Sequence, residues 1–121
     1  MKIIYNNIIP AEGFIAVNLF GVLFVRKKYK EMLDARHEYK TLVINHESIH
    51  TEQMKELLYI GFYIMYAIYY LILLFRYGKT LKAYKMIPFE QEAYNNERDI
   101  EYLSHRKGYA FLQYGLWRKS K

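Results

Sequence analysis

Two histidines separated by one helical turn, with a glutamate directly after the first, are the residues of this chain best suited to chemistry. They belong to His46-Glu47-Ser48-Ile49-His50, which reads H-E-x-x-H. On a helix, residues four apart lie on one face, so both imidazoles could reach one Zn²⁺ at about 2.0–2.1 Å. The glutamate would then stand beside the open coordination position. This spacing predicts a zinc-dependent peptidase, provided that the chain supplies a third ligand.

The segment around this motif has the period of a helix that enters a core. Counting from His46, His50 lies at about 40°, Gln53 at about −20° and Ile64 at about 0°. The stripe that carries the histidines therefore continues as apolar residues further along the chain. Gln53 is either a hydrogen-bond partner of a ligand or bound water, or a polar residue at the boundary of the core.

A third ligand directly after the motif is disfavoured. In the metzincin pattern H-E-x-x-H-x-x-G-x-x-H, a glycine breaks the helix so that a third histidine can turn back. Here Gln53 stands in place of the glycine and Glu56 in place of the histidine. On an unbroken helix Glu56 lies about 280° from His46, away from the histidine stripe. The ligand must therefore come from a later segment.

The best later segment is Pro88-Phe89-Glu90-Gln91-Glu92-Ala93-Tyr94. With the first motif, it resembles the gluzincin branch of the zincin metallopeptidases, in which a glutamate on a second helix is the third ligand. It also resembles small zincin-like proteins that combine H-E-x-x-H-x-x-Q with a later F-E-x-E-A. The resemblance implies Zn²⁺ bound by His46, His50 and Glu92, with Glu47 as the general base.

Glu92 is favoured over Glu90 as the third ligand because Ala93 follows it, and a small residue there lets two helices approach closely. Glu90 is the reserve ligand. Asn96 lies one turn beyond Glu92 and could orient a ligating histidine, a role that metal sites usually fill. A transition-state oxyanion would need a further donor. Three tyrosines are candidates for that role: Tyr94, Tyr102 and Tyr109.

The length of 121 residues predicts one domain over 1–121. Residues 2–5 and 14–25 are rich in Ile, Val and Phe, which indicates short strands. A helical pattern begins near Thr41, and Pro88 is suited to the first turn of a second helix that runs to about Lys107. The fold predicted is α+β, a mainly helical minimal zincin-like domain. Its small N-terminal antiparallel sheet would pack on the helix that carries H-E-x-x-H.

Segment 57–75 contains 19 residues without a charged side chain, which is long enough for a transmembrane helix. Four basic residues follow it: Arg76, Lys79, Lys82 and Lys85. A single span, however, would place the histidines and any later ligand on opposite sides of the bilayer. We therefore expect the helix to break, near Gly61, or to project. A projecting apolar end would contact a membrane surface or a second copy of the chain.

The composition limits the kinds of metal site, partner and cellular location that this chain can have. The absence of cysteine excludes a disulfide scaffold and a thiolate zinc site. The net charge is +6, but no nucleic-acid-binding motif accompanies it, so no nucleic-acid partner is predicted. Polar residues interrupt the first nine residues, so no signal peptide is expected. The location is left open between cytoplasmic and membrane-associated.

Two functions remain open. The first is a zinc-dependent metallopeptidase acting on a peptide or protein substrate, which could bind in extended form along the strand predicted over 21–26. The alternative is a non-catalytic zincin-like module that acts in membrane association or in an oligomeric protein interaction. The apolar segment 57–75 is the feature that favours the alternative.

Overall fold

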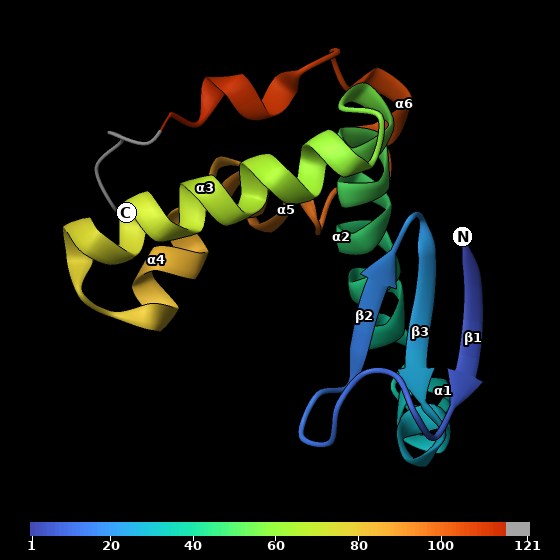
Figure 1. The fold of residues 1–121 in the computed structure, drawn as a ribbon. Helices are drawn as coiled ribbons and strands as arrows, with labels where there is room; N and C mark the ends of the chain where they lie inside the picture. The colour runs from blue at the N-terminus through green and yellow to red at the C-terminus, as the bar shows by residue number, and fades with distance from the viewer. Residues whose placement is uncertain (116–121) are drawn as a thin grey trace.

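A small sheet at the N-terminus packs against a longer helical part, as the computed structural model shows for residues 1–115 (Figure 1). The strands are β1 Lys2–Asn6, β2 Ala16–Leu19 and β3 Val22–Arg26. The α-helices are α1 Lys30–Ala35, α2 His37–Glu56, α3 Ile60–Tyr77, α4 Thr80–Met86, α5 Pro88–Asn96 and α6 Tyr102–His105. Short 3-10 helices cover Lys27–Tyr29 and Ala110–Gln113. The predicted class, a mainly helical α+β fold, is confirmed.

The sheet is mixed, and its strand order is β1-β3-β2. β1 pairs with β3 in parallel and β2 pairs with β3 in antiparallel, whereas the sequence pattern predicted antiparallel pairing throughout. The long connection after β1 carries the chain past β3, so β3 becomes the central strand. The prediction that residues 21–26 offer a free edge is therefore wrong. The strand edge on the side of α2 belongs to β2.

A tight hairpin joins β2 to β3 and fixes the sheet on α2. Phe20 and Gly21 both have positive φ, 54° and 90°, as a two-residue type I′ turn requires. The side chain of Asn18, in β2, donates to the main-chain oxygen of Glu47 at 2.9 Å and to Thr51 Oγ1 at 3.1 Å. These bonds hold the edge strand directly beside the H-E-x-x-H motif.

The chain turns sharply between α2 and α3. Leu58 and Tyr59 have positive φ, 55° and 61°, and Tyr59 N donates to Met54 O at 2.7 Å. A continuous helix over both elements would be ~50 Å long, more than a globule of this size can cover. The turn lets α3 run across the end of α2, which confirms the predicted break near Gly61 (Figure 1).

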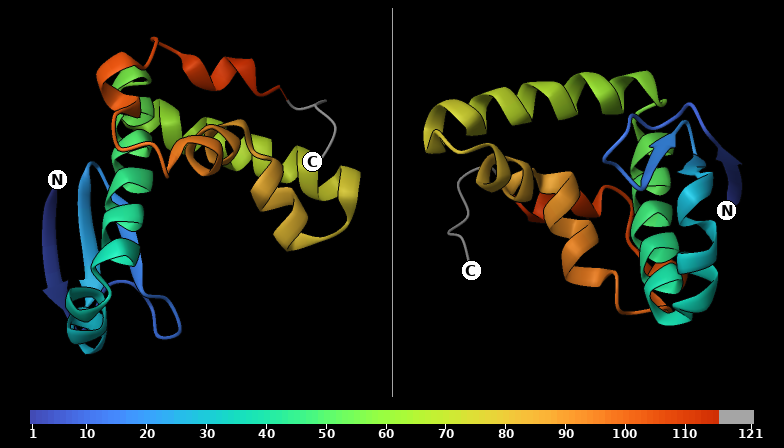
Figure 2. Two further views of the ribbon diagram at one scale, coloured as in Figure 1. Left: turned by 180° about the vertical axis from the view of Figure 1, so that it is seen from behind. Right: turned by 90° about the horizontal axis from the view of Figure 1, so that it is seen from below.

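α5 packs against α2 on one side and α4 on the other, and the further views show α4 and α5 on one side of α3 (Figure 2). Pro88 occupies its first turn, as predicted. The helix ends at Asn96, however, and the chain to Lys107 contains only the four residues of α6. The prediction of one helix from Pro88 to Lys107 is wrong in that part, because residues 97–101 turn back to contact α2.

Two hydrophobic clusters lie on either side of α2. The larger one joins α2, α3, α4 and α5 around Phe89, whose ring contacts Phe62 and Phe111 at centroid distances of 4.6 and 4.7 Å. The smaller cluster joins β3 and α1 through Leu23, Val25 and Leu33. The histidines of α2 are buried with the polar side chains of Glu90 and Gln53 beside them.

Candidate metal centre

Both histidines of the H-E-x-x-H motif point in the same direction from α2 and are buried. His46 is 8% exposed and His50 is 4% exposed. Their Nε2 atoms lie 3.2 Å apart. The prediction that the pair sits where α2 enters the core is confirmed.

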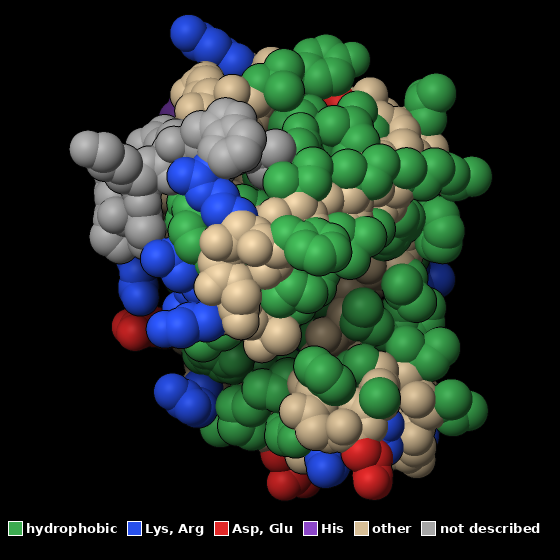
Figure 3. Space-filling view, turned by 60° about the vertical axis from the view of Figure 1, so that its left-hand side comes forward, with side chains coloured by type: hydrophobic (Ala, Val, Ile, Leu, Met, Phe, Trp, Pro, Cys, Tyr) green, Lys and Arg blue, Asp and Glu red, His purple; other side chains and the backbone are tan. Residues whose placement is uncertain are grey.

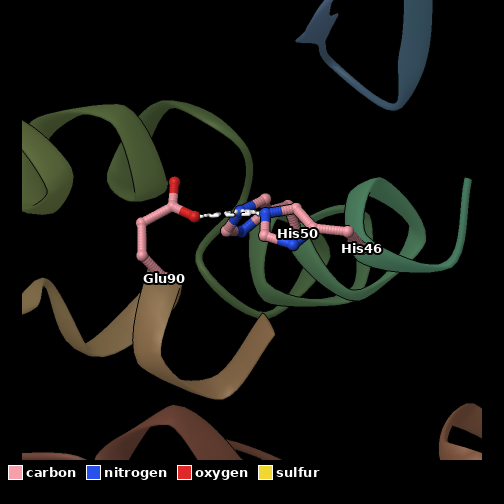
Figure 4. A group of neighbouring side chains, drawn as sticks. All are labelled: His46, His50 and Glu90. Carbon is pink, nitrogen blue, oxygen red and sulfur yellow. Dashed lines mark hydrogen bonds and ion pairs between the residues drawn. The ribbon is translucent and has the colours of Figure 1, made fainter. Parts of the chain in front are cut away.

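Glu90, in α5, supplies the third group (Figure 4). Its Oε1 atom lies 3.2 Å from His46 Nε2 and 3.0 Å from His50 Nε2. Its second oxygen, Oε2, accepts a hydrogen bond of 2.7 Å from the hydroxyl of Tyr66 in α3. Three helices therefore meet at one carboxylate. The resulting buried His-His-Glu group could hold a metal ion.

The outer nitrogen of each histidine has a partner that fixes its proton. His46 Nδ1 lies 3.1 Å from Glu97 Oε1, and a carboxylate there can only accept. His50 Nδ1 lies 2.7 Å from Gln53 Oε1. The amide nitrogen of Gln53 is committed to Phe89 O, so its oxygen must face the histidine. In neutral rings, both Nε2 lone pairs then point toward Glu90.

Three acceptor atoms converge in the site: His46 Nε2, His50 Nε2 and Glu90 Oε1. A positive charge between them stabilises this arrangement. Burial alone would lower the pKa of His50, but the negative charge of Glu90 and its hydrogen bond outweigh burial and raise this pKa to about 9. Burial alone would raise the pKa of Glu90, yet the charge of His50 and the bonds from both histidines hold it well below its usual range. Either a proton or a metal cation satisfies this arrangement.

Glu92, the glutamate that the resemblance favoured, lies away from the two histidines. Its Oε2 accepts from Arg106 Nε at 2.6 Å and from the hydroxyl of Tyr102 at 2.7 Å. Its Oε1 accepts from the amide of Gln53 at 2.9 Å and from Arg106 Nη2 at 3.1 Å. The structure therefore brings Glu90, the reserve ligand, to the histidines and places Glu92 in a buried ion pair behind Gln53.

Glu47 lies beside the His-His-Glu group, where two clefts meet. The larger cleft has a volume of about 440 Å³ and is bordered by His46, Glu47 and Tyr94; the smaller one, of about 240 Å³, is bordered by Glu47, His50 and Glu90. Burial raises the pKa of the Glu47 carboxyl, and the positive charge of the histidines opposes this only in part. A carboxylate of raised pKa beside a metal-ligand group suits proton transfer.

Gln53 proves to be the hydrogen-bond partner of a histidine, one of the two roles considered for it. Asn96 does not have the role predicted for it, since its amide donates to Glu92 O at 2.8 Å. Glu97, the next residue, orients His46 instead. Its spacing of seven from Glu90 places both on nearly one helical face, a signal that was available in the sequence.

The three tyrosines considered as oxyanion donors separate in space. The ring of Tyr94 packs on the ring of His46, with a centroid distance of 4.6 Å. Its hydroxyl lies 3.0 Å from that of Tyr84, which borders the same cleft. Tyr102 is bonded to Glu92, and the main-chain nitrogen of Tyr109 donates to Glu56. Of the three, Tyr94 alone borders the cleft at the metal-ligand group.

Comparison with protein-family models, with curated proteins and with solved structures finds no match to this chain. The function must therefore be inferred from the site itself. The site is compatible with a zincin-like metal centre.

Proposed function

We propose that this protein is a zinc-dependent hydrolase of peptide bonds, with Zn²⁺ held by His46, His50 and Glu90. The observation that carries the proposal is the convergence of His46 Nε2, His50 Nε2 and Glu90 Oε1 at 3.0–3.2 Å from one another. Glu97 and Gln53 direct the protons of both rings away from this point.

The donor set fits zinc in number, chemistry and spacing. Catalytic zinc sites take three protein ligands, and two histidines with one glutamate are a known set. Ligand distances of 2.0–2.1 Å in a tetrahedron separate neighbouring ligand atoms by about 3.3 Å. The separations of 3.0–3.2 Å among the three atoms are close to that value. The outer partners of the histidines are those that metal sites usually require.

Bound zinc would polarise a carbonyl and lower the pKa of a water molecule. Glu47 is the general base. It lies on α2 between the two ligands, and its raised pKa prepares it to take a proton from the attacking water. The same carboxyl then gives the proton to the leaving amine, so that each turnover returns Glu47 to its starting state.

The edge of β2 provides a binding place for an extended substrate. Asn18 O and Phe20 N, on the outer side of this strand, are already bonded to the hydroxyl of Tyr63 at 3.2 and 3.0 Å. Because alternate residues of a strand point the same way, the N–H and C=O of Ala16 also point outward. Ala16 borders both clefts beside Glu47, so a substrate strand would pair there.

Tyr94 and Tyr84 are suited to donate to the oxyanion that forms during hydrolysis. Burial raises the pKa of both hydroxyls, so both remain protonated at neutral pH. They border the cleft on the side of His46, across from β2. A hydroxyl held there adds a donor beyond the metal, as carbonyl hydrolysis requires.

Metal content and peptide hydrolysis test the proposal together. Wild type purified without chelator and supplied with Zn²⁺ should hold about one zinc per chain and cleave a mixed library of fluorogenic peptides. Glu90→Gln should lose the zinc and the cleavage, whereas the matched variant Glu92→Gln should keep zinc while losing stability. Retention of zinc by Glu90→Gln would show that this ligand is misassigned. Wild type that binds no zinc would overturn the whole proposal.

The alternative function, a non-catalytic module, is favoured by one observation, the exposed apolar side of α3. An exposed apolar helix face bears on what the protein contacts, and a protein with such a contact can also be a catalyst. The two functions differ in the hydrolysis assay: a binding module would hold zinc and cleave no peptide. Metal binding without cleavage of any library member by wild type would therefore favour the module.

A further inference from the structure

One side of α3 is apolar and exposed along the whole helix. Counted from Ile64 at 100° per residue, its large exposed apolar side chains fall within about 120° of arc. We call these residues the outer face of α3: Ile60, Ile64, Ile68, Leu71, Ile72 and Phe75. Phe75 is 92% exposed and Ile60 is 66% exposed. A patch of this length on a described surface indicates a contact with something else.

The opposite side of the same helix is occupied by the protein. Phe62 and Leu73 are buried in the larger hydrophobic cluster, and Tyr66 donates to Glu90. Among the described residues, α3 is the one helix long and apolar enough to cross a membrane, but its buried inner side and its packing against α2 and α4 make it part of the domain. The outer face of α3 can therefore contact another surface, while the opposite side of the helix packs in the core and contacts Glu90.

The charged residues within α3 and in the segment that follows it are of one sign. Between Glu56 and Glu90 the sequence has no acidic residue. The segment that follows α3 carries three exposed lysines: Lys79, Lys82 and Lys85. In Figure 3, which brings the far end of α3 forward, hydrophobic side chains cover much of the surface, and Lys and Arg side chains lie along its left border with an acidic side chain beside them. An apolar surface with a basic border complements an anionic lipid surface.

A second copy of the chain complements this surface less well. A two-fold contact brings the same patch against itself, so the patch must supply the partners for its own charges. The last carboxylates before α3 in the sequence, Glu52 and Glu56, are paired with Lys55 and Arg106. Because residues 57–89 contain no acidic residue, a two-fold contact through this segment brings lysines of like charge together, whereas anionic headgroups supply them with partners.

From these observations we infer that the outer face of α3 docks on anionic membranes, with the helix lying parallel to the bilayer. Ile64 and Ile68 enter the interface, and Lys79 and Lys85 contact the headgroups. α3 then separates the His-His-Glu group from the lipid by one helix diameter, about 10 Å. The inference does not depend on the proposed hydrolysis, because it rests on a surface that lies outside the metal-ligand group.

Vesicle co-sedimentation of the full chain tests the inference. Wild type should sediment with vesicles of phosphatidylcholine and phosphatidylserine, more weakly with phosphatidylcholine alone, and less as salt is raised. Ile64→Glu with Ile68→Glu should lower the partition coefficient about tenfold or more per substitution. The matched control, Ile8→Glu with Ile100→Glu, makes the same change at exposed isoleucines on other segments and should leave partitioning unchanged.

A second pair of variants keeps the test valid if the first does not fold. Lys79→Ala with Lys85→Ala leaves the apolar face intact and should weaken binding about fivefold per lysine. Circular dichroism should show wild-type helix content in each variant. Absence of sedimentation with either vesicle, or binding unchanged in both variant pairs, would overturn the inference. So would a stable dimer without lipid affinity that the Ile64 and Ile68 changes make monomeric, since the occupant would then be a second copy.

Discussion

Replacement of Arg106 by methionine would separate the role of Glu92 from that of Glu90. Arg106 donates to both oxygens of Glu92 and to Glu56 Oε1 at 2.9 Å. The side chain of Glu92 is 0% exposed and that of Arg106 is 6% exposed. Methionine replaces the aliphatic part of the side chain and removes its charge and its donors. The variant therefore leaves a buried carboxylate without its cation.

The expected loss follows from burial. Removing one partner of a buried ion pair costs about 3–5 kcal/mol, because the remaining charge stays desolvated. Tyr102 and Gln53 continue to donate to Glu92, so we expect the lower end, about 3 kcal/mol. Domains of this kind are stable by about 5–15 kcal/mol in all. The variant should fold, with a clearly lowered free energy of unfolding.

Urea unfolding followed by circular dichroism measures this loss. Arg98→Met is the matched control, since Arg98 is exposed, and it should change stability by less than about 0.5 kcal/mol. Folded Arg106→Met should still bind about one zinc per chain, because Glu90 stays in place. A loss below about 1 kcal/mol would refute the argument from burial. Loss of zinc at unchanged stability would instead return Glu92 to the ligand set.

Three further substitutions test the site. Glu47→Gln should keep zinc and lower kcat for peptide cleavage about 10²–10⁴-fold, and retained cleavage would remove Glu47 from its role as base. Glu97→Gln should weaken zinc affinity about 10–100-fold in a competition titration with a chelator, because a neutral amide replaces the charged acceptor of His46 Nδ1; unchanged affinity would mean that the charge of Glu97 does not support this ligand. Tyr66→Phe removes the donor to Glu90 Oε2 and should cost about 1–3 kcal/mol of stability by urea unfolding, while a stabilised variant would contradict the bond.

The features that the sequence predicts correctly are local ones. The pairing of His46 with His50 follows from helical spacing, and their burial follows from the apolar residues further along the same stripe. The start of α5 at Pro88 follows from the fixed φ of proline. Each of these depends on residues within a few turns of one another, so a single segment contains the information.

The features that the sequence does not predict depend on distant contacts. The position of β2 at the sheet edge depends on how the connection after β1 passes β3, which no strand pattern records. The end of α5 at Asn96 depends on Asn45 in α2, whose amide donates to Glu97 O at 2.7 Å and to Asp99 O at 3.0 Å. This side chain satisfies main-chain oxygens that a longer helix would have satisfied internally.

The choice between the two glutamates of α5 shows how local and distant information combine. Two residues apart, they point about 200° away from each other, so at most one can face the histidines. Both are buried, and neither burial nor Ala93 distinguishes a ligand from one half of an ion pair. The distant partners decide: Arg106 neutralises Glu92, whereas Tyr66 offers Glu90 a neutral donor and leaves its charge available. Gln53 then links the two carboxylates through His50, so the ion pair of Glu92 helps to orient the ring that faces Glu90.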